Sequence, residues 1–322
     1  MTRLDSANLK PLFIERMKEL LGDDFDNYIE AIEREPPRSI RCNTLKISPS
    51  DLKKRLEAKG WKLSQKFKKN PEIMIIENEL EPGELGRSVE HVLGYYYVQE
   101  IASMLPVIAL NPKPDELVLD LCAAPGSKTT QIASLMKNTG TIIANEVSLG
   151  RIKILASNTE RCGVTNVVIT KQDGAALCRK LKKLDYGFDK ILIDAPCSGE
   201  GTLRSTPKTA IMWNINTVRK LSGVQKDLFS NAFSILKKGG EIVYSTCTHS
   251  PEENEGVVNS ILEEFKGQIK IERINIPIKS REGISKWKER EYLEDVKYSC
   301  RIYPQDDETE GFFIAKFRKV GD

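Results

Sequence analysis

The feature that most constrains the fold is a regular alternation of short apolar runs and amphipathic stretches, which begins near Glu116. Each apolar run has the length and composition of a buried strand, and each stretch between runs has apolar residues at helical spacing. Strands that alternate with helices form parallel βαβ units, whose sheet is covered on both faces. The pattern predicts an α/β fold with a doubly wound, mainly parallel, Rossmann-like sheet, with strands at 117–123, 140–147, 167–173, 189–196 and 241–247 and helices at 127–136, 148–162, 175–184 and 218–236.

The N-terminal part of the chain follows a different pattern. Apolar residues recur at helical spacing over about the first 35 positions, and Pro36–Pro37 ends that pattern. Ser48 and Pro49 are a typical N-cap and first residue of a helix. A small α+β unit is therefore expected, with strands at 38–47, 61–67 and 72–78 and a helix at 48–60. In the second half of the chain, a further helix is expected to start near Pro251.

We expect two domains, an N-terminal helical and α+β domain at 1–94 and a catalytic domain at 95–322. Residues 91–112 are expected to join them. The three tyrosines Tyr95, Tyr96 and Tyr97 could stack on bases, but three adjacent side chains cannot share one face of a strand or a helix. Packing is therefore the favoured role for them.

Charge is unevenly distributed along the chain. The formal net charge is +3, yet residues 34–69 contain twelve lysines and arginines against three acids. A basic segment of this kind suits a polyanionic partner, because each phosphate contact releases condensed counterions. A solvated helix face is the alternative explanation, so charge alone gives RNA about even odds.

Cysteine, histidine and hydropathy exclude several classes of protein. The seven cysteines contain no CxxC pair and there are two histidines, so no metal site is expected. No apolar stretch reaches the ~20 residues of a membrane span, and the first residues lack a secretory apolar core. We therefore expect a cytoplasmic protein with free thiols and no membrane contact.

Acids recur where the predicted parallel strands end. Asp120, Glu146, Asp173 and Asp194 end four strands, and Cys247 ends the fifth. Ligands of open α/β sheets bind beyond these carboxyl ends. Glu146 stands twenty positions after Gly126, where an acid can accept hydrogen bonds from a ribose diol. Asp173 suits either the adenine amine or the N-cap of the next helix.

The loop CAAPGSKTT, which begins at Cys122, indicates which nucleoside binds there. Cys122 and Ser127 occupy the two positions where a P-loop needs glycine, and the dinucleotide fingerprint is absent. S-adenosylmethionine remains, because it carries no phosphate and needs no phosphate cradle. Small residues in this loop would let the cofactor approach the backbone closely.

Five motifs together resemble the Sun-type (Fmu/Nop/Sun) family of S-adenosylmethionine-dependent RNA cytosine-5 methyltransferases. They are RCNTLK, GYYYVQEIASMLP, DLCAAPGSKTT, DAPCSGEGT and YSTCTHSPEENE, in this order. The resemblance implies a methyltransferase domain that follows an RNA-recognition-like domain. It also implies cofactor contacts from Cys122, Ala123, Ala124, Pro125, Gly126, Ser127, Lys128, Glu146, Arg151, Asp173 and Asp194. Ser127 stands where the family usually has glycine, which matters only if that backbone needs a positive φ.

The resemblance makes Cys247 the nucleophile and leaves Cys197 for another step. A thiolate that adds to carbon 6 of cytosine makes carbon 5 nucleophilic toward the sulfonium methyl. Asp194 is the candidate donor to the ring nitrogen N3, which requires a protonated carboxyl, and Lys128 is a candidate for charge balance. Cys197 would then act when the product is released from the enzyme.

Other readings stay open. An isolated cysteine is more often a small buried hydrophobe, which is our expectation for Cys42, Cys162, Cys178 and Cys300. A Cys247–His249 pair is disfavoured, because positions two apart diverge on helices. A retained fold in an RNA-binding assembly factor and a DNA methyltransferase using Cys197 are the alternative functions. Among RNAs tRNA is favoured over rRNA, since no long charged extension is present; protein partners are unknown.

Overall fold

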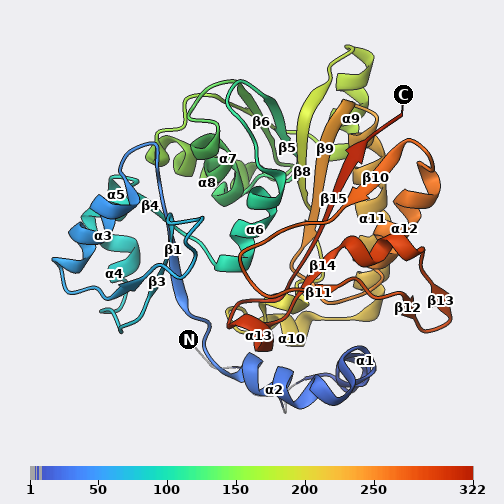
Figure 1. Cartoon of the computed structure of the whole chain (residues 1–322), viewed down its shortest axis with the longest axis horizontal. Helices are drawn as coiled ribbons and strands as arrows, with labels where there is room; N and C mark the ends of the chain where they lie inside the picture. The colour runs from blue at the N-terminus through green and yellow to red at the C-terminus, as the bar shows by residue number, and fades with distance from the viewer. Residues whose placement is uncertain (1–3, 5, 7–8, 322) are drawn as a thin grey trace.

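The computed structural model describes Leu4, Ser6 and residues 9–321 of the chain. The doubly wound sheet predicted from the sequence is confirmed (Figure 1). Its parallel strands lie in the order β7-β6-β5-β8-β9, so the winding reverses between β5 and β8. These strands are β5 (Leu117–Asp120), β6 (Thr141–Asn145), β7 (Val167–Thr170), β8 (Phe188–Asp194) and β9 (Leu236–Thr246).

The C-terminal part extends this sheet with antiparallel strands. β14 (Cys300–Ile302) and β15 (Phe312–Lys319) pair with each other around the short helix α13 (Pro304–Asp307). β15 also pairs with β9 and so joins the hairpin to the parallel strands. The remaining elements of this region are β10 (Ile269–Glu272), β11 (Arg281–Glu282), β12 (Lys286–Trp287), β13 (Arg290–Glu291) and the 3₁₀ helix η4 (Glu294–Tyr298).

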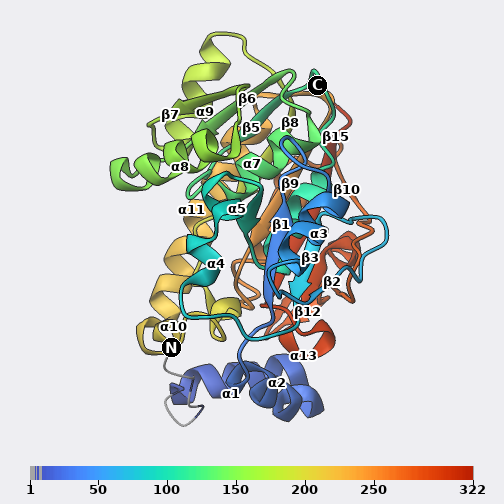
Figure 2. The same cartoon turned by 90° about the vertical axis from the view of Figure 1, so that its left-hand side faces the viewer.

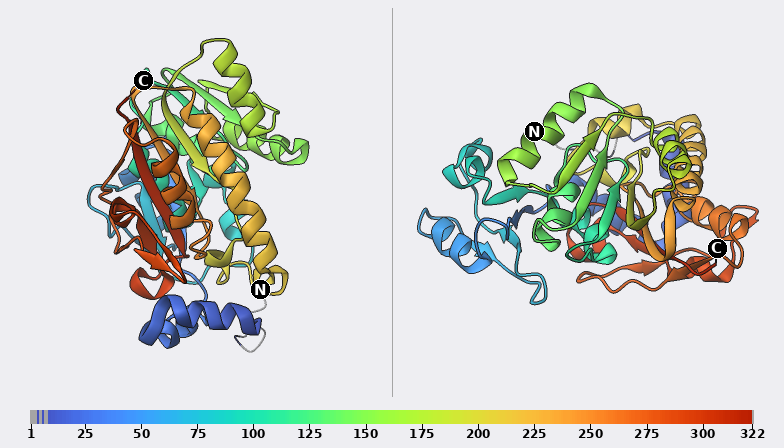
Figure 3. Two further views of the ribbon diagram at one scale, coloured as in Figure 1. Left: turned by 90° about the vertical axis from the view of Figure 1, so that its right-hand side faces the viewer. Right: turned by 90° about the horizontal axis from the view of Figure 1, so that it is seen from above.

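Helices cover both faces of the sheet, which lets every central strand be apolar on both sides (Figure 3). One face packs on α6 (Ile101–Leu110), α7 (Ser127–Leu135) and α8 (Leu149–Cys162). The other face packs on α9 (Gly174–Lys183), α11 (Ile215–Phe233) and α12 (Glu255–Glu264). The helix expected from Pro251 thus begins at Glu255, because residues 251–254 form a turn held by Asn254.

The small sheet has the order β2-β3-β1-β4 and is antiparallel (Figure 2). Ser48 accepts a hydrogen bond from Asp51 N and caps α3, as predicted. The strand expected at 61–67 is reduced to two residues, and residues 96–98 add a strand that the sequence pattern did not indicate. The elements are β1 (Arg38–Cys42), α3 (Pro49–Glu57), β2 (Leu63–Ser64), β3 (Ile73–Ile76), α4 (Glu84–Arg87), α5 (Val89–Val92) and β4 (Tyr96–Val98).

The tyrosines of this region pack as expected. Tyr96 and Tyr97 are buried, and Tyr96 donates a hydrogen bond to Leu85 O. Because β4 pairs with β1, the small sheet continues beyond residue 94. The division of the chain into domains at 94 and 95 stays a prediction.

The N-terminal helices pack against the C-terminal half of the chain rather than against the small sheet. Apolar residues of α1 (Pro11–Leu21) and α2 (Phe25–Glu33) form one cluster with Leu203, Trp213 and Val218. Arg16 of α1 forms an ion pair with Glu252 at 2.6 Å. The 3₁₀ helices η2 (Gly22–Asp24) and η3 (Glu200–Thr202) and the helix α10 (Lys208–Met212) complete this region. None of the helices described is both long enough and apolar enough to cross a bilayer.

Candidate active site

The two thiols singled out from the sequence meet at the carboxyl edge of the sheet. β8 and β9 are parallel neighbours, with Asp194 opposite Ser245, so both strands deliver their following residues to one place. The Sγ atoms of Cys197 and Cys247 lie 3.3 Å apart, and both residues are partly exposed. A small group bound above this edge could therefore touch both sulfur atoms.

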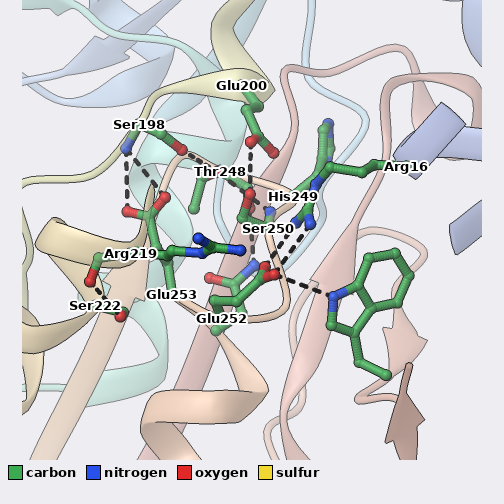
Figure 4. Close-up of polar contacts among 12 residues, drawn as sticks. Arg16, Ser198, Glu200, Arg219, Ser222, Thr248, His249, Ser250, Glu252 and Glu253 are labelled. Carbon is green, nitrogen blue, oxygen red and sulfur yellow. Dashed lines mark hydrogen bonds and ion pairs between the residues drawn. The ribbon is translucent and has the colours of Figure 1, made fainter. Parts of the chain in front are cut away.

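The loops that carry the thiols are bound to each other. The hydroxyls of Ser198 and Thr248 lie 2.7 Å apart, and Gly201 N donates to Cys247 O at 2.9 Å (Figure 4). A Cβ on Gly201 would stand 2.2 Å from Gly311 O, so this approach requires glycine. The spacing of the thiols is thus fixed by backbone contacts as well as by the sheet.

Glu253 forms a further link between these loops, and sequence reasoning missed it. Its carboxyl accepts hydrogen bonds from Ser198 N at 3.1 Å and from Gln225 Nε2 at 2.7 Å (Figure 4). Gln225 Nε2 also donates to Pro196 O, next to Cys197. Burial raises the pKa of Glu253 to about 7. The only sequence signal was its place in the PEENE segment after Cys247.

The two thiols differ in their surroundings. The hydrogen bond with Cys247 and then burial raise the pKa of the Cys197 thiol well above its ordinary value, and the nearby Glu253 adds to this effect. Cys197 therefore keeps its proton at neutral pH and can donate it in the hydrogen bond to the Cys247 sulfur.

Asp194 and Lys128 form an ion pair at this edge. Lys128 Nζ lies 2.7 Å from Asp194 Oδ2 and donates to Ser103 Oγ at 3.0 Å. Ser245 Oγ donates to the other carboxylate oxygen at 2.8 Å. The carboxyl of Asp194 is partly exposed and accepts both bonds. The role of a protonated Asp194 as donor to a ring nitrogen stays a prediction.

The cofactor loop lies beside this ion pair. Ala123 and Ala124 are buried, and Gly126 has a φ of +103° just before α7 begins at Ser127. Ser127 is the first helical residue and has no positive φ, so a serine in place of glycine is not strained there. The remaining residues expected to contact the cofactor in this loop, Cys122, Pro125 and Lys128, lie at the same end of β5.

The acids along the edge have distinct contacts. Glu146 is buried, accepts from Ser148 N at 2.9 Å, and pairs with Arg151 at 3.0 Å. Arg151 also donates to Ala124 O at 2.5 Å and so joins the acid to the loop. Asp173 accepts from Ala176 N at 2.9 Å, which confirms that it caps α9. Its second carboxylate oxygen has no hydrogen-bond partner within the described chain.

Asp120 supplies an observation that favours a polar ligand here. The residue is buried, Thr129 donates to its Oδ2 at 2.7 Å, and its Oδ1 has no partner among the described residues. Burial raises the pKa of Asp120 to about 7. A buried oxygen without a partner costs free energy, which a donor on a bound ligand would recover. Together with the small loop and Glu146, this fits S-adenosylmethionine.

Arg41 of the RCNTLK motif joins the small sheet to the cofactor loop. Its guanidinium is buried and donates to Ser127 O at 2.7 Å, to Thr130 Oγ1 at 2.8 Å and to Gln99 Oε1. The resemblance identified the motif. The role of Arg41 could not be predicted, because the residues that it contacts lie 86 and 89 positions further along the chain.

His249 takes no part in the thiol pair, as expected. Its ring is buried and stacks on Tyr303 with centroids 4.9 Å apart, and burial lowers the pKa of His249 to about 3. The other cysteines, Cys42, Cys162, Cys178 and Cys300, are buried. Within the described residues no group of histidines, cysteines and acids could hold a metal ion.

Comparison with protein-family models gives two matches that together cover most of the chain. Residues 107–318 match the model described as 16S rRNA methyltransferase RsmB/F. Residues 9–101 match the N-terminal domain of 16S rRNA methyltransferase RsmF.

Curated relatives fall into two groups. Ribosomal RNA small subunit methyltransferase F of Aliivibrio salmonicida is 40% identical over 320 residues, which are 98% of this chain and 65% of the relative. The chain thus spans about two thirds of the length of the curated F-type relatives that it matches. The tRNA (cytosine(49)-C(5))-methyltransferase of Pyrococcus abyssi is 40% identical over 306 residues, which are 95% of both chains.

Two solved structures have the same fold over nearly the whole chain. A methyltransferase homolog protein from Pyrococcus horikoshii superposes with a TM-score of 0.84 at 35% identity and covers 98% of this chain and all of its own. NSun6 from Pyrococcus horikoshii with SFG superposes with a TM-score of 0.83 at 28% identity and covers 99% of this chain and all of its own.

Proposed function

Because the chain belongs to the RsmB/F family of S-adenosylmethionine-dependent RNA cytosine-5 methyltransferases, we propose that it methylates carbon 5 of cytosine in RNA, with tRNA as its substrate. The observation that carries the proposal is the 3.3 Å approach of the Cys197 and Cys247 sulfur atoms beside the Lys128–Asp194 ion pair. Covalent activation of a pyrimidine requires a cysteine nucleophile and a proton donor at one place, and the two thiols and the carboxyl of Asp194 lie together at this edge.

The first step uses Cys247 as the nucleophile. Its thiolate forms a bond to carbon 6, the electrons of the C5–C6 double bond move into the C4–C5 bond, and those of the C4–N3 double bond move to N3. Asp194 in its protonated form donates a proton to N3, and Lys128 2.7 Å away balances the charge of the carboxylate that remains. When bound, S-adenosylmethionine would supply an electrophilic methyl group; its bond to sulfur would break as carbon 5 takes the methyl, and S-adenosylhomocysteine would leave.

Release of the product is assigned to Cys197. Cys197 Sγ is 3.3 Å from the departing sulfur and passes its proton to that sulfur as the C6–S bond breaks. The Cys197 thiolate left by this transfer is the base that takes the proton from carbon 5, so the ring recovers its C5–C6 double bond. This division gives each thiol one step.

The cofactor site is proposed to follow the sheet edge. The loop from Cys122 to Lys128 would hold the methionine part, and Glu146 the ribose hydroxyls, with Arg151 fixing that carboxylate at 3.0 Å. Asp173 would take the adenine amine with the carboxylate oxygen that does not cap α9. Asp194 would border the reacting sulfonium.

The choice of tRNA rests on the relatives. The tRNA-acting relative is 40% identical and aligns over 95% of both chains. Ribosomal RNA is the second candidate, because most of the similar curated proteins are small subunit methyltransferases F. The division at residues 94 and 95 would separate RNA docking from catalysis.

Purified protein should be incubated with S-adenosylmethionine and, separately, unfractionated unmodified tRNA transcripts, a 16S rRNA transcript and duplex DNA. Bisulfite sequencing should then show new 5-methylcytosine in tRNA only. Cys247→Ala should abolish it, and the matched control Cys178→Ala, at a buried cysteine outside the site, should not. Methylation of rRNA alone would replace the substrate, and RNA binding without methylation of any nucleic acid would favour an assembly factor.

A further inference from the structure

A cavity of about 400 Å³ lies beside the catalytic edge and is not used by the mechanism above. It lies between the segment that joins α2 to β1, the end of β4, and the loop that follows the Cys197 motif. Its volume is within the range of small-molecule sites. We propose that this cavity binds the nucleotide next to the target cytosine in the RNA strand, an inference that rests on the proposed function.

The first argument is continuity with the catalytic groups. Glu100 lines the cavity and accepts from Ser103 N at 3.2 Å, and Ser103 Oγ accepts from Lys128 of the ion pair. On another wall, Arg204 and Ser205 follow Cys197 by seven and eight positions. A nucleotide in the cavity could therefore belong to the same RNA strand as a cytosine held at the thiols.

The second argument is that the walls are already fixed. Arg204 is buried and donates to Arg34 O at 3.1 Å, Glu35 O at 3.0 Å and Thr309 O at 3.0 Å. Ser39 Oγ donates to Gln99 O at 2.6 Å and fixes β1 to the chain after β4. Pro36 and Pro37 stiffen the segment that joins α2 to β1. A preformed cavity binds its ligand with a smaller loss of entropy.

The third argument is the chemistry of the lining. Val98 is 40% exposed and, with Pro36, Pro37 and Leu85, gives an apolar surface for a flat base. Arg38 is exposed and has no ion-pair partner among the described residues, so it is available to a phosphate. Glu33 and Glu35 also line the cavity, which disfavours a run of phosphates. One base with one phosphodiester, rather than a free polyphosphate, matches this balance.

The cavity is linked to the cofactor loop through Gln99. Gln99 lines the cavity and accepts a hydrogen bond from Arg41, which in turn donates to Ser127 O at 2.7 Å. Because Gln99 is buried and held by these bonds, the cavity has a fixed position relative to the cofactor loop.

The test is Val98→Trp, which fills the cavity from a partly exposed position where folding tolerates bulk. The KM for tRNA should rise at least fivefold while the KM for S-adenosylmethionine stays within twofold. Val168→Trp on β7 is the matched control, because Val168 is exposed and does not line the cavity. An unchanged KM for tRNA in folded Val98→Trp would overturn the proposal.

Arg38→Ala tests the phosphate contact. A plot of the logarithm of the tRNA binding constant against the logarithm of the salt concentration should have a shallower slope than for the wild-type protein. The difference should correspond to the loss of about one phosphate contact. Lys182→Ala, an exposed cation on α9, should keep the wild-type slope. Measuring this binding in a Cys247→Ala background separates the two hypotheses, because it needs no methylation. An unaltered slope for Arg38→Ala would count against the subsite even if the protein methylates tRNA.

Discussion

The sulfur atoms of Cys197 and Cys247 lie 3.3 Å apart, although fifty positions of sequence separate them. The contact is possible because β8 and β9 are parallel neighbours and because Gly201 allows the two loops to touch. Two thiols at this distance can contact the same bound base, and the proposed mechanism gives each of them a different step, so substitution of each should have a different effect.

Cys197→Ala should therefore accumulate a covalent protein–RNA adduct. Methyl transfer would proceed, but the C6–S bond to Cys247 would persist because the release step is impaired. Incubation with tRNA and S-adenosylmethionine followed by a denaturing gel should show a slower band that RNase removes.

The matched variant Cys247→Ala should give no such band under the same conditions. The double variant should also give none, because the nucleophile is missing. If the adduct instead forms in Cys247→Ala and needs Cys197, the roles of the two thiols are reversed.

Lys128→Met and Asp194→Asn should each lower kcat by about 10²- to 10⁴-fold, the usual contribution of a positioned proton donor. The two groups form one ion pair at 2.7 Å and act as a unit, so the double variant should be no slower than the slower single variant. Single-turnover rates with saturating S-adenosylmethionine would measure this. Multiplicative losses would show that the residues act independently.

The convergence of the thiols follows from features that are visible in the sequence. Strand ends of a parallel sheet meet at one edge, so the positions of Asp194, Cys197 and Cys247 after apolar runs already indicated a shared site. The acids Glu146 and Asp173 followed from the same rule. The rule does not give the order of the strands in the sheet. That β8 and β9 are neighbours could not be predicted, because it depends on packing across the whole sheet.

Other features depend on contacts between distant segments and have no local signal. Glu253 is one of many acids in the sequence until Ser198 N and Gln225 are placed against it. The helices α1 and α2 are amphipathic, but their apolar faces do not reveal that Trp213 is their partner. The contact of Asp194 with Lys128 has no local signal for the same reason, since the two residues are 66 positions apart in the sequence.

Arg41→Ala should weaken S-adenosylmethionine binding by about tenfold, which corresponds to ~1.4 kcal/mol. Its guanidinium stays charged at neutral pH, because burial lowers the pKa of Arg41 only to about 10. The variant leaves Ser127 O without this donor, so the start of α7 is less well held. Isothermal titration with S-adenosylmethionine in the absence of RNA measures the effect directly.

Arg55→Ala is the control for this experiment, because Arg55 is a half-exposed arginine of α3 that pairs with Glu90. Arg41→Lys should not restore affinity, since one ammonium does not match the forked contacts to Ser127 O and Thr130 Oγ1. A folded Arg41→Ala protein with wild-type affinity would show that the contact only joins the two parts of the chain.

Glu253 should make the protein less stable as the pH rises from about 5 to 7. Burial raises the pKa of Glu253 to about 7, above the value of about 4.5 for an unfolded glutamate. Between these values the folded state binds more protons than the unfolded state, so the free energy of unfolding falls with pH, by on the order of 1 kcal/mol per pH unit. Above pH 7 both states are ionised and the fall ends. Asp120 and Glu310, whose pKa values burial also raises to about 7, act in the same direction.

Glu253→Gln should remove one part of this pH dependence, because an amide does not titrate and can still accept from Ser198 N. Urea unfolding at pH 5.5, 6.5 and 7.5 should give a shallower decline than in the wild-type protein. Glu263→Gln on α12, at a glutamate outside the site, should keep the wild-type decline. Equal declines in all three proteins would mean that Glu253 is ionised across this range. The link between the two thiol loops would then be a charged one at every pH at which the enzyme works.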